Sequence, residues 1–533
     1  MPKQFQNAEN ARAQLMLGID TLARAVGVTL GPTGRNVVLD QDFGLPQVCS
    51  DGVTIAKEIE LQDPFQNMGA QLVKVAASKT NDAVGDGTTT STVLAQSILR
   101  EGFKNVAAGA DPMALKKGIE TAVNALRTEV EAMARPVEGP EEIARVAALA
   151  AHEDEMGELI AGVLSKVGSQ GIVTVEESKG LGYEVEYVEG MQIDRGYISP
   201  YLVTNQDRML AEIEDPYILI TSEKLSTLAD FLPVLEKLSA VSRNLVVVAE
   251  DIEGEVLSTL VVNKLRGNLN CLGVKAPAFG DRRKAILDDM AILFGATVIS
   301  SDTGRRLDAT EISDLGRCRR VIASKDDTTF VEGSGDASAI QGRTSQIRAQ
   351  AEETTSSYDR EKLEERAAKL SGGVSVMKVG AATEIELREK KHRLEDGLSA
   401  TRAAMEQGIV AGGGTSLVRA AQAISDKLDA SGDERTGINI VMEAVTAPVK
   451  LIADNAGMSG NVVLDEVKKG EGDWGYDAEA GVFGKMFELG IVDPVKVTVA
   501  ALENAASVAG MVLTTESLIT ELNPAKLPAP YND

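Results

Sequence analysis

Apolar residues recur at helical spacing near both ends of the chain, and short β-rich runs fill the middle. In residues 64–84, Phe65, Met68, Leu72 and Val75 fall on one helical face. The same spacing predicts further helices over 10–30, 91–109, 112–134, 417–429, 436–456 and 494–517. In the middle, helical stretches at 225–241, 254–266 and 337–370 accompany the runs VEYVEGMQI, PYILITS, NLVVVAED, CLGVKAP and ATVISS. This alternation predicts an α/β fold between two helical ends.

The chain is too long for one ordinary hydrophobic core, since its 533 residues correspond to about three domains. Hydrophobic residues make up 44% and charged residues 25%, a globular balance. Aromatic residues are only 4% while glycines number 50, so small aliphatic side chains must fill the core. Candidate hinges lie at Arg135-Pro136, Gly190, Gly372-Gly373 and Gly408, where proline or glycine interrupts the pattern.

Several classes of protein are disfavoured by composition. A net charge of −26 argues against a nucleic-acid binder, which needs clustered Lys and Arg. Cys49, Cys271 and Cys318 are far apart, without the spacing of a disulfide framework or a zinc site. The N-terminus lacks a signal-peptide pattern and no run of about 18 apolar residues is seen. We therefore expect no membrane span and a cytoplasmic protein.

Residues 85–91, GDGTTTS, place a carboxylate and two glycines directly before a helix-forming stretch. The first N–H groups of a helix lack partners, and the helix dipole favours an anion such as phosphate. That anion would repel Asp86 unless a divalent cation lay between them, and carboxylate oxygens suit Mg²⁺. The segment could hold a metal-chelated nucleotide, or it could be a Gly-Asp turn with a threonine N-cap on an ordinary helix.

Three other glycine-rich segments and one acidic residue can each be interpreted either as part of a functional site or as ordinary local structure. TLGPTGRN (29–36), CSDGVT (49–54) and VAGGGTS (410–416) could lie against a phosphate or a base, or could be plain turns. Asp396, in a helical stretch, could be a functional acid or a solvated one. A P-loop is not supported, because GxxxxGK[ST] is absent from the chain. Hydrolase triads are not supported either, because the only histidines, His152 and His392, lie far from any GxSxG elbow.

Taken in order, seven segments resemble the group I chaperonins, the bacterial, GroEL-like type. They are TLGPTGRNVVLD, SDGVTIAKEIEL, NMGAQLVKVAASKTNDAVGDGTTTSTVLAQ, VKAPAFGDRRKA, KVGAATEIELREKK, EDGLSATRAAMEQGIVAGGGTSL and GIVDPVKVT. The resemblance implies a multidomain fold with mixed helix and sheet. A mainly helical equatorial ATP-binding domain would comprise 1–132 and 407–533. A small intermediate hinge domain would comprise 133–188 and 374–406. An α/β apical domain, 189–373, would be inserted in the middle.

The resemblance also assigns an ATP site and an ATPase mechanism. The phosphates and Mg²⁺ would lie against Thr29, Leu30, Gly31, Pro32, Ser50, Asp86, Gly87, Thr88, Thr89 and Thr90, with Asp86 as the metal ligand. The base and ribose would lie against Gly413, Asp477, Ala478, Glu479 and Asp493. Asp396 would orient the attacking water, with Asp51 assisting, and K⁺ stays open as a second cation. Because Asp396 belongs to the intermediate segment, we expect it to reach the nucleotide only when a hinge closes.

A client-binding face is implied in the apical segment. Its residues would be Tyr197, Ser199, Tyr201, Leu202, Leu232, Leu235, Leu257, Val261 and Val262. Exposed apolar side chains there would bind unfolded proteins without a sequence code. The alternative is that these side chains pack in a core, which periodicity does not exclude.

The implied assembly is a homo-oligomer of 14 subunits in two stacked seven-membered rings, working with a small, GroES-like co-chaperonin lid. Two other functions stay open: a nucleotide-dependent small-molecule kinase, and an ATP-independent scaffold that only holds unfolded proteins.

Two residues depart from the family pattern and leave the affinity for ATP open. Ser50 stands where many relatives have Lys, and Asp477 replaces the commoner Asn.

Overall fold

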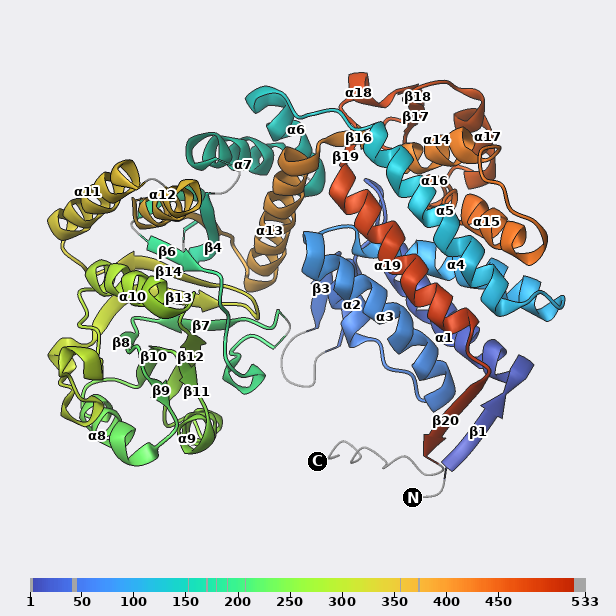
Figure 1. The fold of residues 1–533 in the computed structure, drawn as a ribbon. Coiled ribbons are helices and arrows are strands. Elements are labelled where there is room, and N and C mark those ends of the chain that lie inside the picture. Colours follow the sequence, from blue (N-terminus) through green and yellow to red (C-terminus); the bar gives the residue numbers. More distant parts are fainter. Residues whose placement is uncertain are drawn as a thin grey trace. The chain divides into compact units, whose positions relative to one another are not determined.

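The computed structural model describes residues 3–521 apart from positions 41–45, 152, 169–170, 179, 189, 207, 355 and 372–373. The chain divides into two compact units (Figure 1). Unit 1 comprises Met1–Ser169, Glu177–Gly182 and Val379–Asp533, and unit 2 comprises Gln170–Glu176 and Tyr183–Lys378. The candidate hinge Gly372-Gly373 and His152 lie outside the described residues.

Unit 1 is mainly helical and takes its core from both ends of the chain. Its first set of helices is α1 (Ala8–Gly27), α2 (Gly52–Glu58), α3 (Pro64–Val84), α4 (Thr88–Ala107) and α5 (Pro112–Ala132). Its second set is α14 (Thr415–Ile424), α15 (Gly432–Ala444), α16 (Ala447–Asn455), α17 (Gly460–Lys469), α18 (Met486–Leu489) and α19 (Val495–Leu513). One buried cluster joins the two sets, including Leu15, Leu94 and Leu115 from the first and Ile438 and Leu502 from the second. Neither set alone can bury its apolar faces.

Close backbone contact fixes the pairing of α1 with α3. A Cβ added at Gly69 of α3 would lie 2.2 Å from the carbonyl oxygen of Leu15, and one at Gly18 of α1 would lie 1.8 Å from that of Gln66. Only glycine fits at these two crossings.

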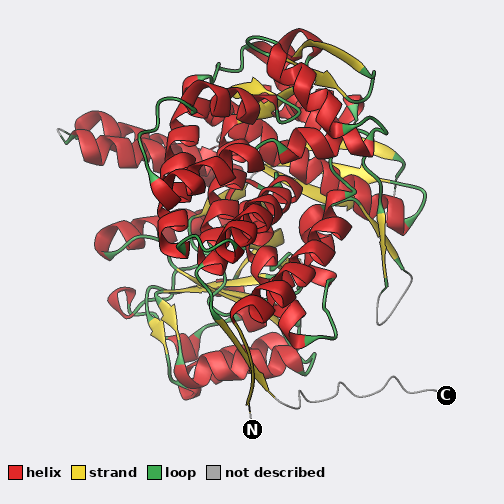
Figure 2. Ribbon diagram, turned by 90° about the vertical axis from the view of Figure 1, so that its right-hand side faces the viewer, coloured by secondary structure: helices red, strands yellow, loops and turns green. Residues whose placement is uncertain are grey.

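Short strand pairs complete this part of unit 1. They are β1 (Lys3–Asn7) with β20 (Ser517–Glu521), β2 (Val37–Leu39) with β3 (Gln47–Cys49), β16 (Ile409–Ala411) with β19 (Val492–Pro494), and β17 (Trp474–Asp477) with β18 (Val482–Lys485). The β1–β20 pair, beside the N mark in Figure 2, places Phe5 opposite Ile519. Segments near the two ends of the chain are thereby hydrogen-bonded to each other.

Three more helices of unit 1 come from the segments predicted as an intermediate domain. They are α6 (Gly139–Ala151), α7 (Asp154–Val167) and α13 (Glu384–Gln407). A three-stranded sheet, in the order β4 (Ile172–Ser178), β15 (Val374–Gly380) and β5 (Gly182–Val188), lies where the chain passes between the units. The intermediate residues are thus divided between the two units, and a separate third domain stays a prediction.

Unit 2 is an α/β body around one sheet. The strand order is β12 (Asn270–Lys275), β10 (Asn244–Ala249), β8 (Tyr217–Ile220), β13 (Gly316–Ala323), β14 (Thr328–Gly333) and β6 (Gly190–Ile193), with β7 (Ala211–Glu214) also paired to β13. Strands β8, β10 and β12 are parallel, and β13 pairs antiparallel with β7, β8 and β14. The accompanying helices are α8 (Leu228–Ser239), α9 (Gly254–Leu265), α10 (Gly280–Phe294), α11 (Ala337–Glu353) and α12 (Ser357–Ser371). The short pair β9 (Lys224–Leu225) and β11 (Asp251–Ile252) lies beside them, with 3₁₀ turns at Pro200–Leu202, Ser301–Thr303, Leu307–Ala309 and Ile312–Asp314.

Most of the predicted elements are present, but several differ. The helical stretch expected over 337–370 is two helices, α11 and α12. The helix expected over 436–456 is two helices, because Pro448, in the first turn of α16, lacks the N–H that a continuous helix needs. The run ATVISS is wrong as a strand: it forms only an isolated bridge between Thr221 and Ile299 and then turns at Ser301. The strands that were not predicted include β4, β7, β13, β14 and β15. In β13 the arginine-rich pattern GRCRRVIA masks the alternation.

Two helical stretches are long and apolar enough to cross a membrane, by length and composition alone. They are Gly432–Asn455, which contains α15 and α16, and Val495–Leu513, which is α19. In each, more than half of the apolar window is buried inside the structure, as in a helix of a protein core.

Candidate functional site

Residues 85–90 form the junction between α3 and α4. Gly85 ends α3 and Gly87 precedes α4, and both adopt the left-handed conformation, with φ of 70° and 77°. Asp86 lies between them and accepts a hydrogen bond from the Gly87 N–H at 2.5 Å. Helix α4 begins at Thr88, and its N-cap, Gly87, supplies no side-chain hydrogen bond. A threonine N-cap, the alternative considered from the sequence, is not what the structure shows. The first N–H groups of a 20-residue helix are left to other partners.

The Thr29–Pro32 loop lies against this junction. The hydroxyl oxygens of Thr29 and Thr89 are 3.2 Å apart, and the Thr29 hydroxyl donates to the carbonyl of Val26 at 2.9 Å. Asn455 of α16 anchors the loop, because its side-chain N–H donates to the carbonyl of Leu30 at 2.9 Å. Gly31 has a φ of 88°.

Asp493 reaches the same junction from the C-terminal part of the chain. It lies on β19, opposite Val410 of β16, and the Gly414 N–H donates to its carboxylate. Burial first, and then the charge of Asp86, raises the pKa of Asp493 to about 7. Two carboxylates from opposite thirds of the chain therefore lie close enough to repel each other at the beginning of α4.

The residues predicted around a base and ribose lie on the neighbouring β17 turn. A Cβ at Gly413 would be 3.7 Å from the Tyr476 carbonyl oxygen, which places Gly413 beside β17. The Asp477 carboxylate accepts hydrogen bonds from the N–H groups of Glu479 and Ala480, at 2.9 and 3.0 Å, and so closes this turn. Ala478 is buried in a small cluster against which Ile452 of α16 packs, and Glu479 is exposed. Since Ile452 also contacts Gly31, the turn and the Thr29–Pro32 loop border the same helix.

Asp51 and Ser50 approach the junction from β3 and α2. Asp51 caps α2, since its carboxylate accepts from the N–H groups of Val53 and Thr54, both at 3.1 Å, and from the Thr54 hydroxyl at 2.6 Å. The next residue, Gly52, touches the start of α4: an added Cβ would lie 2.4 Å from the Thr89 hydroxyl oxygen. Both carboxylate oxygens of Asp51 are thus engaged in local structure.

Asp396 lies on α13 in the wall of a cavity of about 580 Å³ that Ser50 and Asp51 also line. Burial, and after it the charges of Asp51, Asp396 and Glu389, raises the pKa of the Cys49 thiol to about 12, so each of these carboxylates lies near Cys49. Helix α13 touches the α3–α4 junction, where a Cβ at Gly85 would lie 2.5 Å from that of Ser399. Asp396 and Asp51 thus line the same cavity. That Asp396 reaches a nucleotide only when a hinge closes stays a prediction.

Sequence reasoning missed three contributors to this site. Gly52 allows close packing against the start of α4. The Gly414 N–H donates to the Asp493 carboxylate, and Asn455 anchors the loop at Leu30. Both glycines belong to glycine-rich segments that the sequence analysis singled out, CSDGVT and VAGGGTS. No local sequence pattern predicts the role of Asn455, because its partner, Leu30, lies near the other end of the chain. In the described residues there is no cluster of three or more His, Cys, Asp or Glu that could by itself hold a metal ion.

The residues predicted as a client-binding face fall into three groups in unit 2. Tyr197, Ser199 and Leu202 are buried, so for them the structure supports the alternative of core packing. Leu235, Leu257 and Val261 are partly buried against that core. Tyr201, Leu232 and Val262 are exposed by 68%, 42% and 42%. Helices α8 and α9 are in contact, and Val241 and Leu265, which the sequence did not single out, are also exposed near their ends.

A family model provides independent evidence on the whole chain. The model of the TCP-1/cpn60 chaperonin family matches residues 22–522. The match includes the loops that meet at α4, the helix that carries Asp396 and the whole of unit 2. The chain therefore belongs to the TCP-1/cpn60 chaperonin family.

Proposed function

We propose that this chain is an ATP-driven group I chaperonin that hydrolyses ATP to ADP and phosphate while it captures and encloses unfolded client proteins. Membership of the chaperonin family supports a role in protein folding, binding of clients and assembly into rings. The use of ATP, the site residues and the enclosure are our proposal.

The observation that carries the nucleotide proposal is the meeting of Asp86 and Asp493 at the beginning of α4. Burial, and after it the charge of Asp86, raises the pKa of Asp493, and a cation beside Asp86 would relieve the repulsion between the two acids. An uncapped helix N-terminus on the same spot favours phosphate oxygens. This donor set fits Mg²⁺ chelated by a polyphosphate, and the metal, when bound, would offset phosphate charge.

Each group of residues has a proposed task. Thr88, Thr89 and Thr90 and the Thr29–Pro32 loop would contact the phosphates, with Ser50 offering at most a hydroxyl. Gly413, Asp477, Ala478 and Glu479 would border the base and ribose, with Asp493 beside the ribose. Asp396 would accept a hydrogen bond from the attacking water and orient it. The capping contacts of Asp51 support a positioning task for it near that water.

The proposed client face is narrower than the one expected from the sequence. It consists of Tyr201, Leu232 and Val262, which are exposed, with Leu235, Leu257 and Val261 at their base. Exposed apolar area binds any chain that shows apolar surface, which suits unfolded proteins of unrelated sequence.

We further propose two stacked rings of seven subunits, a small GroES-like co-chaperonin lid and a cytoplasmic location. Electron micrographs with and without ATP and co-chaperonin test the assembly.

The nucleotide site is tested with three variants of the full chain. Asp86→Asn should weaken Mg-ATP binding in calorimetry, whereas Asp82→Asn, at an exposed acid in the last turn of α3, should not. Asp396→Ala should keep binding but lose roughly 10²-fold or more in ATP turnover. If Asp86→Asn bound Mg-ATP as tightly as the unaltered protein, the nucleotide site would be misplaced. Normal client refolding by Asp396→Ala would instead favour the ATP-independent holding function.

A further inference from the structure

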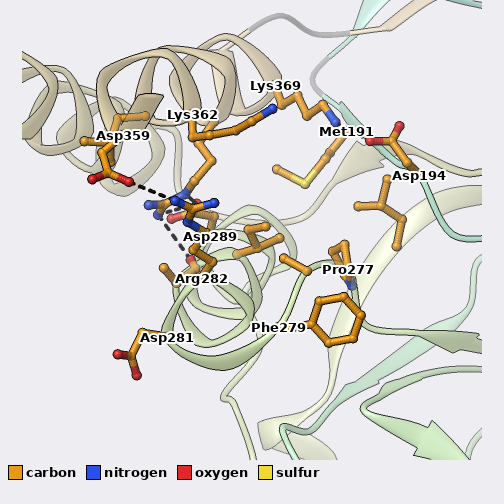
Figure 3. A pocket seen from close by; sticks show the side chains of 16 residues that line it. Met191, Asp194, Pro277, Phe279, Asp281, Arg282, Asp289, Asp359, Lys362 and Lys369 are labelled. Atoms are coloured by element: carbon orange, nitrogen blue, oxygen red, sulfur yellow. Dashed lines mark hydrogen bonds and ion pairs between the residues drawn. The ribbon is translucent and has the colours of Figure 1, made fainter. Parts of the chain in front are cut away.

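Charged side chains around a cavity in unit 2 pair with one another. The cavity has a volume of about 680 Å³ and lies between β6, the start of α10 and α12 (Figure 3). Its lining holds four acidic and four basic side chains. They include the ion pairs Arg282–Asp359, Arg366–Asp289 and Lys369–Asp194. The lining is therefore balanced in charge and favours neither an anion nor a cation.

Arg419 of α14, in unit 1, differs from these arginines because it donates to the main chain. Its Nε donates to the carbonyl of Gly472 at 2.9 Å. Its Nη2 donates to the carbonyls of Val467 at 2.6 Å and Trp474 at 2.8 Å, and its Nη1 donates to the side-chain oxygen of Gln422 at 2.8 Å. Within the part of the chain that the structure describes, Arg419 forms no ion pair. Its guanidinium therefore holds backbone rather than a carboxylate.

The backbone that Arg419 holds is the connection between α17 and β17. Val467 lies in the last turn of α17, and Trp474 is the first residue of β17. Between them, Glu471 and Gly472 are exposed, and Gly472 has a φ of 60°. Apolar burial contributes little to fixing an exposed loop with a glycine, so the three carbonyl contacts of Arg419 are well placed to do so.

Helix α14 also reaches the proposed nucleotide site with its other end. Gly414 is the N-cap of α14, and its N–H donates to the carboxylate of Asp493. The first residue of the helix, Thr415, packs directly against β17, because a Cβ at Gly475 would lie 2.4 Å from its hydroxyl oxygen. One helix of 10 residues therefore connects Asp493 to the strand that leads into the Asp477–Glu479 turn.

We propose that Arg419 is a positioning residue for the nucleoside part of the ATP site. It fixes β17, and with it the Asp477–Glu479 turn, relative to Asp493. The inference rests on the proposed function, because that function makes the turn a border of the base and ribose. It does not extend to the phosphates, which would lie at the beginning of α4. Loss of Arg419 should therefore weaken recognition of the nucleoside and spare recognition of the phosphates.

The test compares Mg-ATP with magnesium tripolyphosphate, which offers phosphates without a base or ribose. Both are titrated calorimetrically into the full-length protein and into Arg419→Ala. If the turn held its bound position in only about one-tenth of the molecules, the apparent affinity for ATP would fall about tenfold. We expect that loss for Mg-ATP, with the affinity for magnesium tripolyphosphate within about twofold of the unaltered protein. The KM for ATP should rise by the same factor while kcat changes by less than about threefold.

Two further variants separate positioning from general stability. Arg419→Lys keeps the charge but lacks the planar fork of donors, so it should weaken Mg-ATP binding by only about threefold and again spare tripolyphosphate. Arg435 of α15 is the matched control, because it donates to the carbonyls of Leu428 at 2.8 Å and Ser425 at 3.1 Å in the α14–α15 connection. Arg435→Ala should leave the ratio of the two affinities unchanged, even where it lowers the melting temperature.

Hydrogen exchange without nucleotide, read by mass spectrometry, should be faster across residues 468–477 in Arg419→Ala and unchanged in α4. The inference is overturned if either Arg419 variant binds Mg-ATP as the unaltered protein does, or loses affinity for both compounds equally. It is also overturned if Arg435→Ala shifts the ratio as much as Arg419→Ala. If the unaltered protein binds neither compound, the proposed function fails and this inference fails with it. Equal losses in a variant of a protein that binds both refute the role of Arg419 alone.

Discussion

Burial, together with the nearby charge of Asp86, raises the pKa of Asp493 to about 7. The two acids come from α3–α4 and from β19, so their proximity depends on correct assembly of both terminal parts of unit 1. This pair therefore provides a measurable signature of that assembly.

The first prediction concerns stability against pH in the absence of nucleotide. Between the ordinary aspartate pKa of 3.8 and about 7, the folded protein holds a proton on Asp493 that the unfolded chain has lost. Stability should therefore fall as pH rises through this window, by at most about 1.4 kcal/mol per pH unit from this group. Asp493→Asn should remove that part of the slope. Urea unfolding at pH 5 and 7.5, followed by fluorescence of Trp474, the single tryptophan and a residue of unit 1, measures it. Equal slopes in both proteins would mean that Asp493 is not desolvated.

The second prediction concerns the crossing of α1 and α3. Gly69→Ala forces a Cβ to within 2.2 Å of the Leu15 carbonyl oxygen, so the helices must move apart. We expect a loss of about 2–4 kcal/mol in the stability of unit 1. Gly162→Ala is the matched control, because Gly162 lies in helix α7 with open space around its Cβ position. That change should be neutral or slightly stabilising. A neutral Gly69→Ala would contradict the packing described.

The third prediction concerns the buried carboxylate of α10. Asp289→Ala leaves Arg343 and Arg366 without their shared partner, and we expect unit 2 to lose about 3–5 kcal/mol. Asp281→Ala, on the exposed side of the same helix, should cost little. Hydrogen exchange of α10 and α11, read by mass spectrometry, should show faster opening in the first variant only. Equal exchange in both variants would show that the two arginines are satisfied elsewhere.

The fourth prediction concerns the exposed apolar side chains of α8 and α9. Replacing Leu232 and Val262 with Ser should reduce capture of an unfolded client at least several-fold without lowering stability, because both side chains are exposed. Leu202→Ser should do the reverse and destabilise unit 2, since Leu202 is fully buried. Capture is measured by suppression of aggregation of a denatured enzyme, and stability by circular dichroism. If both variants captured clients normally, the face would lie elsewhere.

The sequence predicted the helices of unit 1 well, because long amphipathic periodicity is a local signal. Helix α3 was predicted over 64–84 and is observed as Pro64–Val84, with Pro64 at its first position and Gly85 after its last. Strand β13 was missed, because Arg319 and Arg320 do not look like sheet residues. In the structure these arginines pair with Glu176 and Glu212, respectively, and these are partners that no local pattern reveals.

The candidate site was predictable only in part for the same reason. GDGTTT indicates a left-handed turn before a helix, and the structure has one. The contact between Thr29 and Thr89, and the anchoring of Leu30 by Asn455, depend on the tertiary fold. Burial also depends on that fold, which is why Leu202 and Tyr201, one residue apart, differ so strongly in exposure.

The shared core of unit 1 has a consequence for how the protein is made. Helices α1 to α5 leave the ribosome long before α14, α15 and α19, which complete their core. The roughly 280 residues between Ala132 and Thr415 take about 15–60 s to synthesise at common translation rates. During that interval the apolar faces of the early helices lack their partners, while unit 2, nearly continuous in sequence and with a core of its own, can fold. A nascent chain of this family is itself exposed to the aggregation from which its members protect other proteins.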